Sequence, residues 1–256
     1  MRLRTAAGLL SGAMAMTAAA QAPMQVEVEG AVRHPGRYAP PPGERLATLA
    51  LSAMPTSQAY PLGAALLREE ALVRQTRLKA GLLHGLAQLQ QRTDTPLQVV
   101  SAAARMQHWL QSAPVTGRVR VQLSPRRTEI DPQANLPLRD GDRLRYPARP
   151  TGIEVLGAVR EACTLAHAPL RDARDYLADC PPAGADADWL YAIQPDGAVQ
   201  RLGVAAWNRS PPQALAPGAR LYVPLPERAL REVDPAFNGE FADFVATQLL
   251  PLAEAP

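Results

Sequence analysis

Short segments of this 256-residue chain alternate between apolar and polar residues. Residues 24–29 (MQVEVE) alternate strictly, as a strand does when one of its faces is buried. The turn residues Pro35 and Gly36 follow, so a return strand and a hairpin are expected here. The next segment predicts a short helix, with an apolar face made of Leu46, Leu49, Ala50 and Ala53.

The same pattern returns later in the chain. Residues 155–160 (VLGAVR) are identical to residues 28–33 (VEGAVR) at five of six positions, 127 residues further on. Residues 217–224 (PGARLYVP) match residues 140–147 (DGDRLRYP) in the same way, but 77 residues further on. The chain therefore contains a diverged duplication, and the first copy carries an insertion of about 50 residues.

The second copy predicts the same elements as the first, with a strand at 153–159 and a helix at 170–178. Two strands, a helix and then a late pair of strands is the order of a β-grasp (ubiquitin-like) domain. We therefore expect an α+β fold with two tandem β-grasp domains, at residues 23–150 and 151–228.

The insertion in the first copy covers about residues 60–112. Its leucines recur at mainly helical spacing, at Leu62, Leu66, Leu78, Leu82, Leu86 and Leu89. Thr95 and Pro96 then form a typical helix start. A second apolar stripe follows, made of Val100, Ala103, Met106 and Leu110. The pattern predicts a helical hairpin.

Residues 229–256 form the last predicted unit, an amphipathic helix and tail. The helix should begin near Asp234, and its apolar stripe holds all three phenylalanines of the chain, Phe237, Phe241 and Phe244. This stripe could dock on the β-grasp cores, on a partner helix or on a membrane. Membrane binding is the least favoured, because the polar face lacks the Lys and Arg that anionic lipids attract.

Composition and the N-terminus indicate an exported globular protein. Hydrophobic residues make up 47% of the chain, which excludes wholesale disorder, and 26 prolines disfavour an all-helical bundle. Arg2, Arg4, a small apolar run and A-x-A sites near residues 18–22 predict a signal peptide at residues 1–22. No run of 18 apolar residues follows, so no membrane span is expected in the mature chain. A net charge of +3 is too small to indicate nucleic-acid binding.

Cys163 and Cys180 are the only cysteines. In an exported chain they could form a disulfide, which would close a loop of about 17 residues and contribute ~3 kcal/mol. The alternative is a pair of buried free thiols. Their spacing does not fit a metal site.

The sequence offers no catalytic pattern. The four histidines, His34, His84, His108 and His167, are scattered, and no nucleophile, zinc, phosphate-loop or dinucleotide motif is present. Nothing selects a pair of carboxylates for sugar hydrolysis. We therefore expect no catalytic residue, no metal and no cofactor.

One segment is rich in arginine. Between Arg118 and Arg149 there are eight arginines against four acidic residues. Arg118 and Arg120 alternate with valines and should point from one strand face. With Arg143 and Arg145 they form a candidate surface for the carboxylates of an acidic polysaccharide or for a partner protein. The alternative is a solvated face with local ion pairs.

Two short motifs carry a family resemblance. V-x-G-A-V-x-x-P-G-x-Y at residues 28–38 and G-x-R-L-x-x-L at residues 43–49 resemble the SLBB motif, a soluble ligand-binding β-grasp. Two such units, a helical insertion, a signal peptide and a terminal helix resemble the GfcC-type capsule biosynthesis family. The second copy departs from the motif, because Ala162 and Cys163 replace Pro35 and Gly36.

The resemblance implies a non-catalytic periplasmic accessory protein of capsule or exopolysaccharide assembly and export. Its partners would be the polysaccharide export machinery, including an outer-membrane exporter, or an acidic polysaccharide, and not nucleic acid. Two alternatives remain. A periplasmic polysaccharide-modifying hydrolase would need convergent carboxylates in a pocket, and a small-ligand sensor would need an apolar concavity between the domains.

Overall fold

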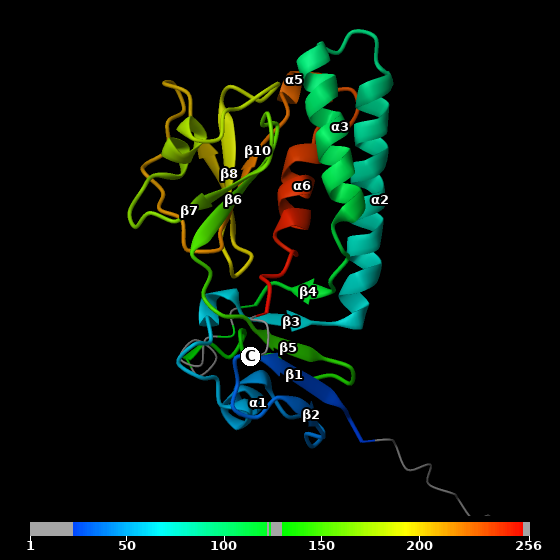
Figure 1. Cartoon of the computed structure of the whole chain (residues 1–256). Helices are drawn as coiled ribbons and strands as arrows, with labels where there is room; N and C mark the ends of the chain where they lie inside the picture. The colour runs from blue at the N-terminus through cyan, green and yellow to red at the C-terminus, as the bar shows by residue number, and fades with distance from the viewer. Residues whose placement is uncertain (1–22, 122, 124–129, 253–256) are drawn as a thin grey trace, which may run out of the picture.

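The computed structural model describes residues 23–121, 123 and 130–252. The predicted signal peptide lies outside the described residues, as do the last four residues of the chain. The chain forms two five-stranded sheets, with a pair of long helices running alongside one of them (Figure 1). The predicted α+β class with two tandem units is confirmed.

The first sheet has the strand order β2-β1-β5-β3-β4 that is expected of a β-grasp domain. Its strands are β1 (Val26–Gly30), β2 (Gly36–Tyr38), β3 (Ala65–Leu67), β4 (Arg118–Val119) and β5 (Arg143–Tyr146). β1 and β5 are parallel, and the other neighbours are antiparallel. The predicted helix is α1 (Leu46–Ala53), whose four apolar residues named above are all buried.

The second sheet repeats this arrangement in the order β7-β6-β10-β8-β9. Its strands are β6 (Gly152–Gly157), β7 (Cys163–Ala166), β8 (Trp189–Ile193), β9 (Val199–Gly203) and β10 (Arg220–Val223). Val28 faces Leu144 in the first sheet, and Val155 faces Leu221 in the second. These pairs are the ones that the 127- and 77-residue separations align. In place of the helix predicted at 170–178 there is a shorter 3-10 helix, η2 (Ala173–Ala178).

The glycine of the shared G-A-V motif is required by the backbone in both copies. Gly30 has a φ of +97° and Gly157 a φ of +103°, a conformation that favours glycine. A Cβ atom at Gly30 would lie 2.1 Å from the carbonyl oxygen of Tyr146, and one at Gly157 would lie 2.3 Å from that of Val223. The motif is therefore explained by a close approach of β1 to β5 and of β6 to β10.

The insertion is a helical hairpin of α2 (Glu69–Gln91) and α3 (Leu97–Ser112). It connects β3 to β4, whereas the second copy makes the same connection, from β8 to β9, by a short turn. The prediction that the helical insertion begins near residue 60 was wrong at that end. Leu66 belongs to β3 and pairs with β5, because a three-residue strand precedes the first helix.

The hairpin packs on the second sheet, although it is inserted in the first copy. One core joins Leu82 and Leu86 of α2 and Met106 of α3 to residues of β6, β8 and β10. The terminal helix α6 (Phe237–Val245) lies between the hairpin and this sheet (Figure 1). A separate, smaller core forms between α1 and the first sheet.

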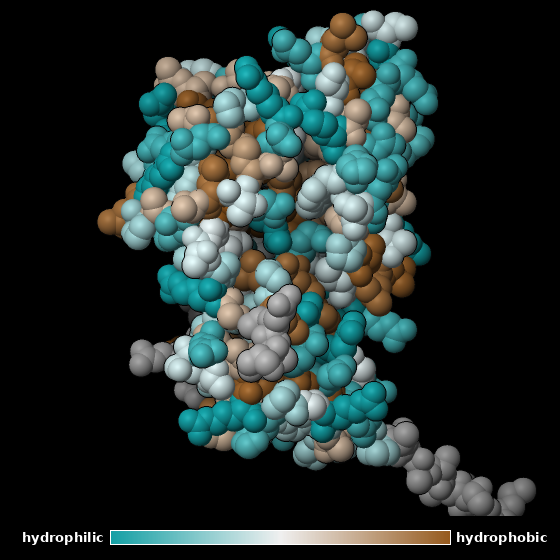
Figure 2. All heavy atoms as spheres, in the orientation of Figure 1, coloured by the Kyte–Doolittle hydropathy of each residue, from teal (hydrophilic) through white to brown (hydrophobic). Residues whose placement is uncertain are grey.

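Figure 2 shows hydrophilic residues over most of the outer side of the hairpin, with hydrophobic residues visible between the hairpin and the second sheet. The described residues also include two short helices, η1 (Pro61–Gly63) and α5 (Glu227–Leu230). Over the described part of the chain, no helix combines the length and the apolar character that crossing a membrane requires.

Candidate functional site

The phenylalanine stripe of α6 lies inside the protein. Phe237, Phe241 and Phe244 are each 0% exposed. The ring of Phe241 lies 4.7 Å from that of Tyr222 and 5.6 Å from that of Trp109, measured between centroids. Of the three interpretations of this stripe, docking on the protein's own domains is the arrangement observed. A partner or a membrane could reach these rings only after the hairpin had moved.

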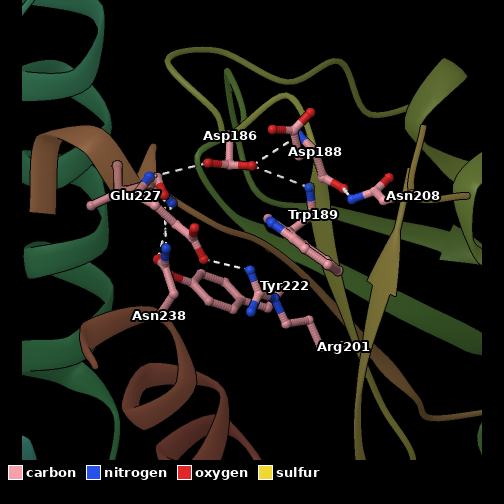
Figure 3. Close-up of polar contacts among 9 residues, drawn as sticks. Asp186, Asp188, Trp189, Arg201, Asn208, Tyr222, Glu227 and Asn238 are labelled. Carbon is pink, nitrogen blue, oxygen red and sulfur yellow. Dashed lines mark hydrogen bonds and ion pairs between the residues drawn. The ribbon is translucent and has the colours of Figure 1, made fainter. Parts of the chain in front are cut away.

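A buried polar side chain fixes α6 to the second sheet. Asn238, which the sequence pattern assigns to a polar face, is 5% exposed. Its Oδ1 accepts hydrogen bonds from the Tyr222 hydroxyl at 2.8 Å and from the Leu225 N–H at 3.2 Å (Figure 3). Its Nδ2 donates to the Leu225 carbonyl at 2.8 Å. Burial raises the pKa of Tyr222 well above its ordinary value, so the hydroxyl remains a donor.

A second polar centre joins α5 to the start of β8. The Asp186 carboxylate accepts hydrogen bonds from the N–H groups of Asp188 at 2.9 Å and Trp189 at 3.1 Å. Its other oxygen accepts from the N–H of Glu227, the first residue of α5, at 3.1 Å. Arg201 of β9 forms an ion pair with Glu227 (Figure 3). These contacts hold the loop before β8 against the helical side of the second unit.

The prediction that Arg118 lies on an exposed face of β4 was wrong. Its side chain is 4% exposed, because β4 lies where the two sheets meet the end of α6. The guanidinium donates to the carbonyls of Ala246 and Gln248, both at 3.3 Å, and of Pro195 at 2.5 Å. Carbonyls at a helix C-terminus attract a cation. Burial, together with the nearby charge of Arg220, lowers the pKa of Arg118 to about 10.

The other three predicted arginines do not join Arg118 in one surface. Arg120 is exposed and pairs with Asp243 of α6 at 2.8 Å. Arg143 is exposed on β5. Arg145, two residues further along the same strand face, pairs with Glu29 of β1 at 2.5 Å. The structure thus divides the predicted surface into a buried structural arginine, an ion pair on α6 and an open face on the first sheet.

A cleft of about 470 Å³ lies beside the junction of the two sheets. Trp109, Arg145, Glu154 and Arg220 are among its lining residues. Arg220 donates to the Glu154 carboxylate at 2.8 Å and to the Gln248 carbonyl at 3.0 Å. Sequence reasoning missed Arg220, although the 77-residue repeat aligns it with Arg143, which was already a candidate.

Cys163 and Cys180 form a disulfide with Cα atoms 6.1 Å apart. It encloses the loop that contains η2, and Cys163 stands where the first copy has Gly36. His167 lies with its Nε2 2.9 Å from the Leu215 carbonyl oxygen, which is a structural contact. No group of three or more His, Cys, Asp or Glu residues suited to a metal ion occurs in the described ranges.

Comparison with known proteins finds one family over both units. The family described as "Capsule biosynthesis GfcC, N-terminal" matches residues 20–148, and "Capsule biosynthesis GfcC C-terminal" matches residues 161–250. Among curated proteins, the "Uncharacterized protein YjbG" of Escherichia coli (strain K12) is 28% identical over 190 residues. That alignment covers 74% of this chain and 76% of YjbG.

Proposed function

This chain belongs to the GfcC capsule biosynthesis family, and we propose that it is a non-catalytic accessory protein of capsule or exopolysaccharide assembly and export. The observation that carries the proposal is the extent of the match. It takes in the first sheet, the hairpin, the terminal helix and every strand of the second sheet except β6.

We place this function in the periplasm. A disulfide persists in oxidising compartments such as the periplasm, and Cys163 and Cys180 are bonded to each other. The charged start and small apolar run of residues 1–22 are typical of a signal peptide that would direct the chain there.

The use of the buried polar groups supports a structural, non-catalytic role. Arg118 donates to three backbone carbonyls, and Asn238 is bonded to Tyr222 and Leu225. Both side chains are buried and join one element of the fold to another, so they lie where a substrate does not reach them. We therefore assign function to the surfaces of the protein.

The surface that we propose for an acidic polysaccharide is the open face of the first sheet. Arg143 and Arg145 project from this face of β5, and Arg145 also lines the cleft beside the second sheet. An arginine fork fits the carboxylate of an acidic sugar. The proposed protein partner is the export machinery, including an outer-membrane exporter.

A deletion strain tests the proposed function in cells. We expect polymer on the cell surface to fall while total polymer is retained, and the wild-type gene to restore export. Normal amounts of both polymers would contradict the proposal. An R143A/R145A variant should restore export poorly, whereas the charge-matched control R160A/R231A, which removes two exposed arginines outside the first unit, should restore it fully.

A further inference from the structure

Trp207 is unusual among the aromatic residues of the protein. The described residues include all twelve aromatic side chains, and Trp207 is the one exposed among them, with 73% of its surface accessible. A single exposed hydrophobic residue needs no explanation in itself. The surroundings of this indole do call for an explanation, because they hold the ring in place without burying it.

Two contacts hold the indole in place. Its Nε1 donates to the Asp188 carboxylate at 3.2 Å. Its ring lies perpendicular to that of Trp189, at an interplanar angle of 86° and a centroid distance of 6.3 Å. The next residue, Asn208, donates from Nδ2 to the Asp188 carbonyl at 2.9 Å, which ties the Trp207 loop to the start of β8.

Trp189 is itself held in place by neighbouring side chains. The Arg201 guanidinium carbon is 3.6 Å from the centroid of the Trp189 ring, and Arg201 is itself held by Glu227. Asp186 accepts the backbone N–H groups of both Asp188 and Trp189, as Figure 3 shows. Because the indole is positioned before a ligand arrives, little ordering entropy is lost on binding.

The chemistry around Trp207 fits a sugar ring. A pyranose presents a flat patch of C–H groups that stacks on an aromatic face, with hydroxyls at its rim that donate to a carboxylate. Trp207 supplies the exposed ring, and the partly exposed Asp188 supplies the carboxylate beside it. A stable protein interface needs about 800 Å² from each partner, far more than one indole offers.

We infer that Trp207 and Asp188, supported by Trp189, form a binding subsite for one sugar residue of a polysaccharide chain. This inference rests on the proposed function, since it names the kind of polymer contact that an export accessory makes. It places that contact on the second unit, away from the Arg143 and Arg145 face of the first.

Binding of polymer to the full, oxidised protein tests the inference. The probes are the purified surface polysaccharide of the source bacterium and its oligosaccharide fragments, with dextran as the comparison polymer. Calorimetry and indole fluorescence should show binding to the wild type and roughly tenfold or greater weakening in W207A. W207F should retain part of the affinity. The control L170A removes a side chain that is 91% exposed in the same unit and should bind normally.

Each other outcome overturns the inference. Equal binding by W207A and wild type would place the sugar contact elsewhere and leave the proposed function standing. Absence of binding by the wild type would remove the subsite. Loss of surface polymer in cells carrying W207A, with polymer binding intact, would assign the indole to a protein partner. Because the assay uses purified components, its result does not depend on the phenotype of the deletion strain.

Discussion

The two copies of the repeat have the same strand order but opposite chemistry on one sheet face. In the first copy Glu29 faces Arg145, and the two form an ion pair at the surface. The aligned positions of the second copy hold Leu156 and Tyr222, which face each other in the same register and are buried. An open face in one copy has thus become a covered face in the other.

The cover for the second sheet comes from outside the second copy. The hairpin of α2 and α3, inserted in the first copy, and the terminal helix α6 share one core with Leu156 and Tyr222. The duplication is therefore no longer a pair of independent domains, because one copy completes the core of the other.

Exchanging the residue types at the aligned positions 29 and 156 should have the largest effect on stability. Leu156→Glu places a carboxylate among apolar side chains and should lower the free energy of unfolding by about 3–5 kcal/mol. Glu29→Leu removes one partner of a half-exposed pair and should change it by only about 1 kcal/mol. Urea unfolding of both variants measures the difference. Similar losses in the two variants would mean that the faces are not different environments.

Removing the disulfide should have the next largest effect, and only on the second copy. It encloses a segment with a sequence separation of 17, so its loss should cost about 3 kcal/mol. The C163A/C180A double variant, or reduction of the wild type, should lower the unfolding midpoint. Hydrogen exchange should quicken around η2 and stay unchanged in β1 and β5. Faster exchange in the first sheet would contradict this localisation.

Replacing the buried tyrosine of either sheet, Tyr222 or Tyr146, with phenylalanine should change stability by a smaller amount. Tyr222→Phe removes the donor to Asn238 and should cost about 1–2 kcal/mol. The hydroxyl of Tyr146 in the first sheet is buried and has no hydrogen-bond partner among the described residues, so Tyr146→Phe should be neutral or slightly stabilising. Thermal unfolding of the two variants at neutral pH compares them. A larger loss from Tyr146→Phe would show that its hydroxyl makes a contact after all.

The smallest effect concerns alkaline pH. Burial raises the pKa of Tyr146 to about 12, whereas an unfolded tyrosine ionises near pH 10. Between these values the unfolded state has released a proton that the folded state keeps, so stability falls as the pH rises. At pH 11 this loss should be about 1.4 kcal/mol, and Tyr146→Phe should abolish it. Tyrosinate absorbance of the folded wild type should show Tyr146 ionising only near pH 12.

The sequence repeat predicted the sheets well, for a physical reason. Gly30 and Gly157 occupy positions where a Cβ would collide with the neighbouring strand, so this strand pairing requires glycine in both copies. The helix face of α1 and the helical character of the insertion followed from apolar spacing alone. The short strand β3 was missed, because three apolar residues before a helix have no period of their own.

The sequence pattern could not predict contacts between segments that are distant in the chain. Arg118 looked exposed because valines alternate with it, yet carbonyls from residues about 80 and 130 positions away surround it. Asn238 looked solvated because the helical spacing places it outside the phenylalanine stripe, yet it is 5% exposed. One signal was present and unused: the change from Glu29 and Arg145 to Leu156 and Tyr222 marks the sheet face that the helices cover.

Removal of the hairpin tests the central claim most directly. Arg68 and Gly117 are joined by a backbone hydrogen bond of 2.9 Å, so a Pro-Asp-Gly turn copied from residues 195–197 can connect β3 to β4 as the second copy connects β8 to β9. In hydrogen exchange, we predict that β6, β8 and β10 lose protection while β1 and β5 keep theirs. Full protection of both sheets without the hairpin would contradict the claim that the first copy completes the core of the second.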